Sequence, residues 1–165
     1  MLKFKIAKEG DILLIQELAH TIWHSHYPGI ISVEQIEYML DLMYSANCIN
    51  KEITDGHKWV LLLLKDQPVG FLSYNFESEN RKVKLNKLYI LSSFHGHGYG
   101  QQSLNYVKTH AKDLHALILY LTVNKQNKKA IDAYLKAGFY IDKDIITNIG
   151  HGYIMDDYIM AFNLN

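Results

Sequence analysis

The sequence predicts an α+β fold built on a mostly antiparallel sheet. Three observations support this prediction: apolar residues alternate with lysines at the start, two amphipathic helical patterns follow, and most later segments are typical of strands. Only two further helical patterns interrupt those strands. The expected order is therefore strand, two helices, three strands, helix, strand, helix and two strands.

The spacing of apolar residues predicts the first three elements. Over 2–6 they alternate with lysines, as in a half-buried strand. Over 12–22 they recur every three or four positions, which is typical of one face of a helix. A second helix is expected over 33–43, because Ser32 and Gln35 form a capping-box pattern in front of its apolar positions.

The second half is dominated by strand patterns separated by turn residues. The predicted strands cover residues 59–64, 69–76, 83–91, 116–123, 139–146 and 153–163. The first three should form an antiparallel meander. Because 116–123 is continuously apolar, we expect a central strand that is buried on both faces.

A helix is expected after Gly98 to about Asp113, with Leu104, Val107, Ala111 and Leu114 as its buried stripe. Another is expected over 127–137, with Ile131 and Leu135 facing inward and Gly138 as a left-handed cap. A loop over 148–152 should join the last two strands.

Composition narrows the classes of protein that fit. A length of 165 residues, 48% of them apolar, predicts a single domain over 1–165. Seventeen basic residues balance seventeen acidic ones, so neither nucleic acid nor a membrane is an expected partner. The longest apolar run, 59–64, is far shorter than the roughly twenty residues of a membrane-spanning helix. The single Cys48 and a start without an apolar leader predict a cytoplasmic protein.

A glycine-rich turn joins a predicted strand to a predicted helix, with the sequence Gly96-His97-Gly98-Tyr99-Gly100. Glycines allow close backbone approach, and the amides at a helix N-terminus favour a pyrophosphate. A tight turn without a ligand is the alternative interpretation. The dinucleotide fingerprint of dehydrogenases is disfavoured, because it normally follows the first strand of a parallel unit.

Two segments resemble the GNAT superfamily of N-acetyltransferases. The strand 87–91 and the turn after it resemble the acetyl-CoA motif Gln/Arg-x-x-Gly-x-Gly/Ala, with His95 in the place of glutamine or arginine. Asn127, Tyr134 and Gly138-Phe139 resemble the second cofactor segment, Asn-x6-Tyr-x3-Gly-Phe. The resemblance implies a GNAT fold with three α/β/α layers, about seven mixed, mostly antiparallel strands, four helices, and a splayed central parallel strand pair.

The resemblance also implies acetyl-CoA as acetyl donor and CoA as product. It identifies Tyr134 with the family's proton donor to the departing thiolate, whose phenol stays protonated at neutral pH. Because His95 departs from the motif, the turn should bind chiefly through its backbone amides. The implied cofactor-binding residues are Leu88, Tyr89, Ile90, His95, Gly96, His97, Gly98, Tyr99, Gly100, Gln101, Asn127 and Tyr134.

The resemblance leaves the general base open. Some relatives carry a glutamate on the strand after the glycine-rich helix, but this chain has Thr122 there, which cannot take a proton. Another group or a water chain must act. The candidates are His24, His151 and Asp156, together with His26 and Asp157.

The expected acceptor is a small primary amine such as a polyamine. The segment 23–29 is expected to form the loop between the first two helices, where relatives usually contact the acceptor, and its aromatic side chains could enclose an amine. The predicted acceptor-binding residues are Trp23, His24, Tyr27 and Asp157. A non-catalytic acyl-CoA sensor and an enzyme that acetylates protein N-termini or lysines are the alternatives. The resemblance also favours a homodimer, because late strands in this family often pair between subunits.

One place in the sequence has histidines spaced as metal ligands often are. His20 and His24 are four residues apart on a predicted helix and could clamp an ion together with His26. No acidic or cysteine residue lies between these histidines or in the seven residues after His26. We therefore predict no metal.

Overall fold

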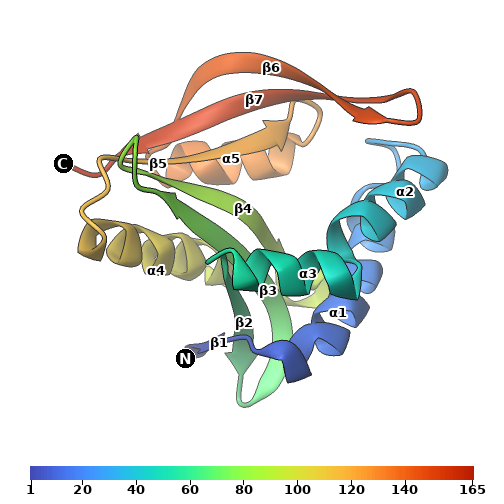
Figure 1. Cartoon of the computed structure of the whole chain (residues 1–165), viewed down its shortest axis with the longest axis horizontal. Coiled ribbons are helices and arrows are strands. Elements are labelled where there is room, and N and C mark those ends of the chain that lie inside the picture. Colours follow the sequence, from blue (N-terminus) through green and yellow to red (C-terminus); the bar gives the residue numbers. More distant parts are fainter. The chain divides into compact units, whose positions relative to one another are not determined.

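The strands form one mixed sheet of seven, in the order β1-β2-β3-β4-β5-β7-β6 (Figure 1). The computed structural model describes residues 1–165 and has five α-helices, one more than predicted. The α+β class is confirmed. The elements are β1 (Leu2–Ile6), α1 (Ile12–His26), α2 (Val33–Tyr44), α3 (Ala46–Thr54), β2 (Lys58–Leu64), β3 (Gln67–Glu77), β4 (Lys82–Ile90), α4 (Tyr99–Asp113), β5 (Ile118–Asn124), α5 (Lys128–Lys136), β6 (Tyr140–Gly150) and β7 (Tyr153–Asn163).

The chain divides into two compact units, each made of two separate stretches. The first unit comprises Met1–Asn75 and Lys87–Ser103, and the second comprises Phe76–Asn86 and Leu104–Asn165. Strands β3 and β4 and helix α4 therefore each begin in one unit and end in the other. A single domain over 1–165 stays a prediction.

In the first unit, α1, α2 and α3 pack against one another (Figure 1). The apolar face of α1 predicted from its spacing is buried, including Ile15 and Ala19. Helix α2 begins where expected, because the Ser32 hydroxyl accepts a hydrogen bond from the Gln35 amide at 3.1 Å.

Helix α3 is the helix that the sequence analysis missed. Ser45 caps it by accepting a hydrogen bond from the Cys48 amide at 3.2 Å. Ile49 is the one residue of α3 that is fully buried. A helix of nine residues with so narrow a buried face has too little apolar periodicity to be detected.

A bulge in β3 brings two strands of the first unit into close contact. The register passes from Leu62–Gly70 to Leu63–Pro68, which leaves Val69 as the extra residue. The Val69 carbonyl accepts a hydrogen bond from the Leu91 amide at 2.9 Å, just beyond the end of β4. A Cβ atom on Gly70 would collide with the Tyr89 carbonyl oxygen and would lie 3.0 Å from the Ile90 Cα.

Gly70→Ala should therefore destabilise the fold by about 1–3 kcal/mol, because backbone atoms cannot turn aside as a flexible side chain can. Urea denaturation followed by circular dichroism measures the change. Gly10→Ala is the matched control, since a Cβ there meets no atom within 4 Å, and it should change stability by less than about 0.5 kcal/mol. Equal stability of the two variants would show that β3 and β4 tolerate the added methyl group.

Strand β5 is central to the second unit. It pairs in parallel with the start of β4, from Lys82–Ile118 to Lys84–Tyr120, and antiparallel with β7 along its whole length. The registered parallel pairs end there, although both strands continue. Leu119, Leu121 and Val123 are buried, but Thr122 is exposed, so the prediction that both faces are buried was wrong.

Gly138 terminates α5 as predicted, in the left-handed conformation with a φ of +91°. The Phe139 amide donates to the Tyr134 carbonyl and the Gly138 amide to the Leu135 carbonyl, both at 3.0 Å, which is a Schellman motif. Lys108 from α4 donates to the Ala137 carbonyl at 2.5 Å and closes the same helix end.

Three smaller predictions in the second unit were wrong. Leu114, expected to be buried, lies past the end of α4 and is exposed. Leu135, expected to face inward, is 47% exposed. Strand β6 runs on to Gly150, so the predicted loop at 148–152 is a tight turn at His151.

Candidate active site

The glycine-rich turn of the first unit is shaped to bind an anion. Gly96 and Gly98 have φ values of +79° and +78°, which glycine adopts without strain, and the space beside each of them is open. Helix α4 begins at Tyr99, and the Gln102 amide donates to the Gly98 carbonyl at 3.0 Å. The N-terminus of α4, which follows this turn, is the positive end of the helix dipole and favours negative charge.

Histidine side chains brace this turn against its own backbone. His95 Nε2 lies 2.7 Å from the Ile90 carbonyl oxygen, and His97 Nδ1 lies 2.9 Å from the His95 carbonyl oxygen. The His97 ring also stacks on Tyr99 at 5.7 Å. The His95 side chain therefore holds the path of the chain from β4 into the turn. This is a structural role, distinct from the direct cofactor contact that the resemblance implies.

Aromatic residues predicted for the acceptor lie in the core of the first unit. Trp23 is 1% exposed and its indole N–H donates to the Tyr44 hydroxyl at 3.3 Å. Tyr27 packs on Trp23 at 4.3 Å between ring centroids, and its hydroxyl lies 2.9 Å from that of Tyr89, near the end of β4. The prediction that residues 23–26 belong to a loop was wrong, because they form the last turn of α1.

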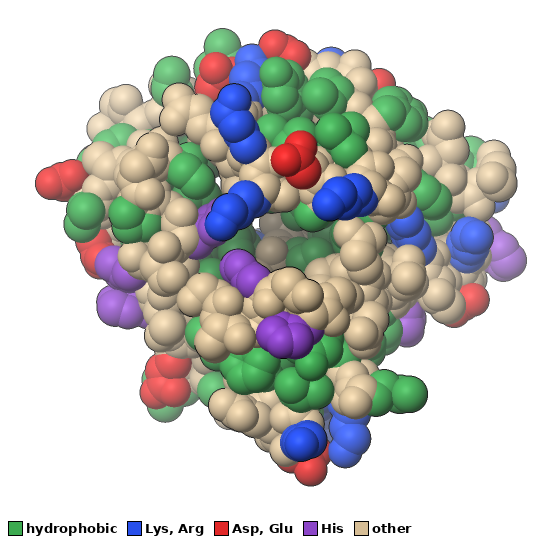
Figure 2. Space-filling view, turned by 180° about the vertical axis from the view of Figure 1, so that it is seen from behind, with side chains coloured by type: hydrophobic (Ala, Val, Ile, Leu, Met, Phe, Trp, Pro, Cys, Tyr) green, Lys and Arg blue, Asp and Glu red, His purple; other side chains and the backbone are tan.

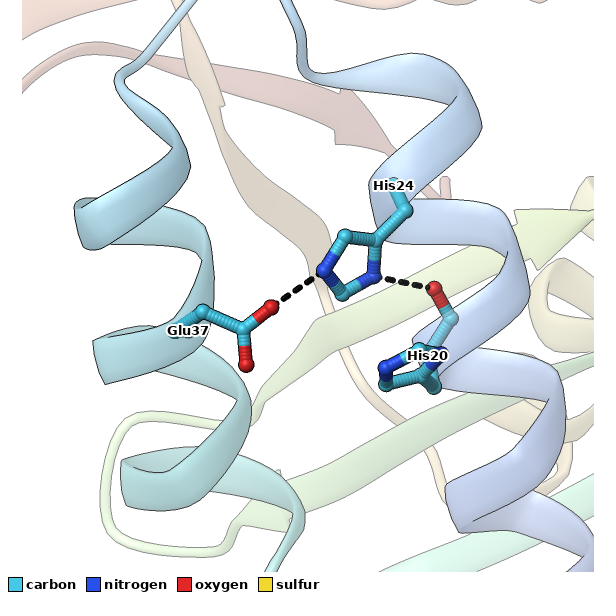
Figure 3. A group of neighbouring side chains, drawn as sticks. All are labelled: His20, His24 and Glu37. Carbon is cyan, nitrogen blue, oxygen red and sulfur yellow. Dashed lines mark hydrogen bonds and ion pairs between the residues drawn. The ribbon is translucent and has the colours of Figure 1, made fainter.

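His24 is engaged through both of its ring nitrogens. Its Nδ1 lies 2.8 Å from the His20 carbonyl oxygen, and its Nε2 contacts the Glu37 carboxylate from α2 (Figure 3). The hydrogen bond to the His20 carbonyl, followed by that to Glu37, raises the pKa of His24. Both ring nitrogens are thus occupied within the first unit.

In the second unit, Asn127 and Tyr134 lie at opposite ends of α5. Asn127 is buried and caps the helix, since its side-chain oxygen accepts from the Ala130 amide at 3.4 Å. The Tyr134 ring packs on Phe139 at 5.8 Å between centroids, the hydrophobic contact that accompanies a Schellman motif. Both side chains therefore have structural roles in addition to those that the resemblance implies.

Asp157 differs from the other candidate bases of this unit. It is 8% exposed, and its Oδ1 is buried without a hydrogen-bond partner. It lies in β7 opposite Asn124 of β5. Burial, with a smaller contribution from the neighbouring Asp156 charge, raises the pKa of Asp157 to about 6. A carboxylate with this pKa can accept a proton at neutral pH.

The other two candidates are solvated. Asp156 is half exposed and forms an ion pair with Lys125 at 2.8 Å. His151 is exposed at the turn between β6 and β7, with a φ of +50°. Thr122, at the position of the family glutamate, is exposed on β5.

Charges of both signs are interspersed with apolar side chains on the face shown in Figure 2.

None of the helices combines the length and the hydropathy that crossing a bilayer requires.

Sequence reasoning missed two features of the first unit, the close approach at Gly70 and the contact of Glu37 with His24. A glycine inside an otherwise apolar strand pattern was a signal for the first. No signal in a single sequence pairs residues from two different helices.

The chain combines a seven-stranded mixed sheet with a glycine-rich turn that joins β4 to α4. This arrangement is typical of N-acetyltransferases. The family model described as acetyltransferase (GNAT) family matches residues 16–139. The chain belongs to this family, and its class is acyltransferase. Uncharacterized N-acetyltransferases from Mycobacterium bovis and Mycobacterium tuberculosis are 28% identical over 137 residues, which cover 83% of this chain and 87% of theirs.

Solved structures share the fold. PaiA N-acetyltransferase from Thermoplasma acidophilum, in complex with coenzyme A, is 22% identical with a TM-score of 0.85 over 99% of each chain. Spermidine N-acetyltransferase from Vibrio cholerae, in complex with CoA and spermine, is 18% identical with a TM-score of 0.72, over 99% of this chain and 95% of the other.

Proposed function

We propose that this protein transfers the acetyl group of acetyl-CoA directly to a primary amine of a small molecule such as a polyamine. The observation that carries this proposal is the glycine-rich turn, whose two left-handed glycines lead into the N-terminus of α4. Family membership supports acetyl transfer, and a structural neighbour crystallised with coenzyme A supports the donor. No metal takes part in the proposed reaction.

The donor would be held mainly by backbone groups. We assign the pyrophosphate to the amides of 96–101, where a helix N-terminus favours negative charge. Leu88, Tyr89 and Ile90 at the end of β4 would bind the pantetheine arm through backbone hydrogen bonds, as the resemblance implies. Asn127 is assigned to the same arm, because its side-chain nitrogen stays available as a donor when its oxygen caps α5.

The reaction needs a neutral amine and a proton for the departing thiolate. We assign the base to Asp157, the one candidate carboxylate that is buried, since the two ring nitrogens of His24 are engaged and Asp156 is paired with Lys125. The acid is Tyr134, on the grounds of its match to the family motif. The carbon–sulfur bond of the thioester breaks as the nitrogen–carbon bond forms, and the thiolate takes the phenolic proton.

A polyamine is favoured as acceptor by two considerations. Some structural neighbours are spermidine N-acetyltransferases, and one of them was solved with spermine. A buried aspartate also provides a negative partner for a cationic amine as it approaches. Tyr27 and Trp23 would shape the acceptor side from within the core of the first unit. A homodimer and a cytoplasmic location stay predictions.

The proposal is tested by incubating the protein with acetyl-CoA and one amine at a time, and measuring the release of free CoA thiol. The panel contains polyamines, amino acids, aminoglycosides and a lysine-containing peptide. We expect turnover with spermidine or spermine, and mass spectrometry should find acetylated amine. Cofactor binding without turnover on any amine would instead favour an acyl-CoA sensor, and turnover confined to the peptide would favour a protein acetyltransferase.

A further inference from the structure

Helices α1 and α2 of the first unit bring together three side chains that the sequence keeps apart. His20 and His24 lie one turn apart on α1, and Glu37 reaches them from α2 (Figure 3). One ligand atom from each of these residues lies within 4.8 Å of the other two. The His20 and His24 rings are 4.2 Å apart between centroids, so the imidazoles lie beside each other.

Two imidazoles and one carboxylate form a donor set that divalent transition metals prefer. Bonds of about 2.0–2.1 Å to a tetrahedral zinc ion place ligand atoms about 3.4 Å apart. His20 and Glu37 are exposed, so their side chains can rotate by the small amount that closes a 4.8 Å spacing to this value. The two helices would not have to move.

The hydrogen bond of His24 to the backbone orients this residue as a ligand. Its Nδ1–H donates to the His20 carbonyl at 2.8 Å, which directs Nε2 toward Glu37. Metal-binding histidines are commonly held in this way, with the nitrogen that does not bind the metal donating to a carbonyl or carboxylate. Without a metal, the Nε2 contact with the carboxylate needs a proton between the two atoms, and a metal ion replaces that proton.

We propose that His20, His24 and Glu37 bind a divalent transition-metal ion of the zinc type, with water in the remaining position. The sequence analysis disfavoured this site because no acidic residue lies between the histidines or directly after them, and Glu37 of α2 supplies a carboxylate in the structure. The ion links α1 to α2 across the segment 27–32, so it stabilises the helix pair. The proposal involves neither Asp157 nor Tyr134, and its test does not depend on acetyl transfer.

The test is titration of the full-length protein, freed of metal with a chelator, with ZnCl₂ in a calorimeter, together with melting temperatures in zinc and in EDTA. We expect the wild type to bind zinc and to melt at a higher temperature in its presence. His24→Ala and Glu37→Gln should each weaken zinc binding at least about tenfold. Loss of a residue that only hydrogen-bonds to a metal ligand already costs about 10- to 100-fold in affinity, and loss of the ligand itself should cost no less. Both variants should lose the zinc-dependent rise in melting temperature.

His110→Ala is the matched control. His110 also lies on a helix with its Nδ1 2.9 Å from a carbonyl oxygen four residues earlier, but it is outside the trio. It should leave zinc affinity within twofold of the wild type. Absence of zinc binding by the wild type, unchanged affinity in His24→Ala and Glu37→Gln, or an equal loss in His110→Ala would each overturn the proposal. Melting curves in EDTA confirm that every variant is folded.

Discussion

Replacing Asp157 with asparagine should lower kcat/KM for the amine by about 10²- to 10⁴-fold, because an amide cannot take the proton of the attacking amine. The variant should also be more stable than the wild type at pH 7. Burial disfavours the carboxylate, and the asparagine keeps nearly the same shape without the charge. Loss of activity together with a gain of stability is a combination that general damage to the fold does not produce.

The pH dependence follows from the same residue. The pKa of Asp157 is raised to about 6, from 3.8, so the folded state binds the proton more strongly than the unfolded state does. The stability contributed by this residue is therefore present at low pH and is lost as pH rises through 6. Activity runs the other way: kcat/KM should rise with pH around a midpoint near 6, as the base forms. Asp157→Asn should remove that midpoint from the pH profile.

Asp156→Asn is the control for this experiment. Asp156 is the neighbouring carboxylate, but it is solvated and paired with Lys125. Its loss should change turnover by less than about threefold, in line with the small contribution of exposed ion pairs. If Asp156→Asn lost activity while Asp157→Asn kept it, the assignment of the base would be wrong.

Tyr134→Phe should lower kcat by about 10²- to 10⁴-fold, because the departing thiolate loses its proton donor. Phenylalanine keeps the ring that packs on Phe139 at the end of α5, so the variant removes the hydroxyl alone. Steady-state kinetics with acetyl-CoA, together with a melting curve, measure the two effects. The melting temperature should change little, and the KM for acetyl-CoA should change much less than kcat.

Tyr140→Phe provides the comparison within the same unit. Tyr140 is exposed, and its hydroxyl donates only a long hydrogen bond, 3.5 Å, to Asn163. Turnover by this variant should match the wild type. Full turnover by Tyr134→Phe would remove the residue from the mechanism and leave it as the hydrophobic contact at the end of its helix.

Local signals in the sequence were enough to predict most of the fold. The Ser32 cap, the apolar face of α1 and the Gly138 cap depend on residues within a few positions of one another, and the structure contains all three. Helix α3 was missed because it buries so little apolar surface. Both faces of β5 were predicted to be buried because its sequence is almost continuously apolar. Such a run does not reveal that the face carrying Thr122 is exposed.

Only part of the candidate site could be predicted from the sequence. The glycine-rich turn was recognisable because its geometry depends on left-handed backbone conformations at Gly96 and Gly98, which glycine favours. The properties of Asp157 were not, since they depend on burial by strands distant in sequence. The same holds for Glu37, whose contact with His24 joins two helices that only tertiary packing brings together. Burial and long-range pairing decide which of several similar side chains can act.

The division of the chain into two discontinuous units has a consequence for its synthesis. The first unit has all its residues once Ser103 has been added, whereas the stretch Phe76–Asn86 of the second is made long before its parallel partner on β5. The start of β4 must therefore wait, with its backbone groups unpaired on that side, until Ile118–Tyr120 leave the ribosome. A nascent chain halted between these points would contain every residue of the first unit together with an unpaired strand edge at the start of β4, and such edges can pair with other chains.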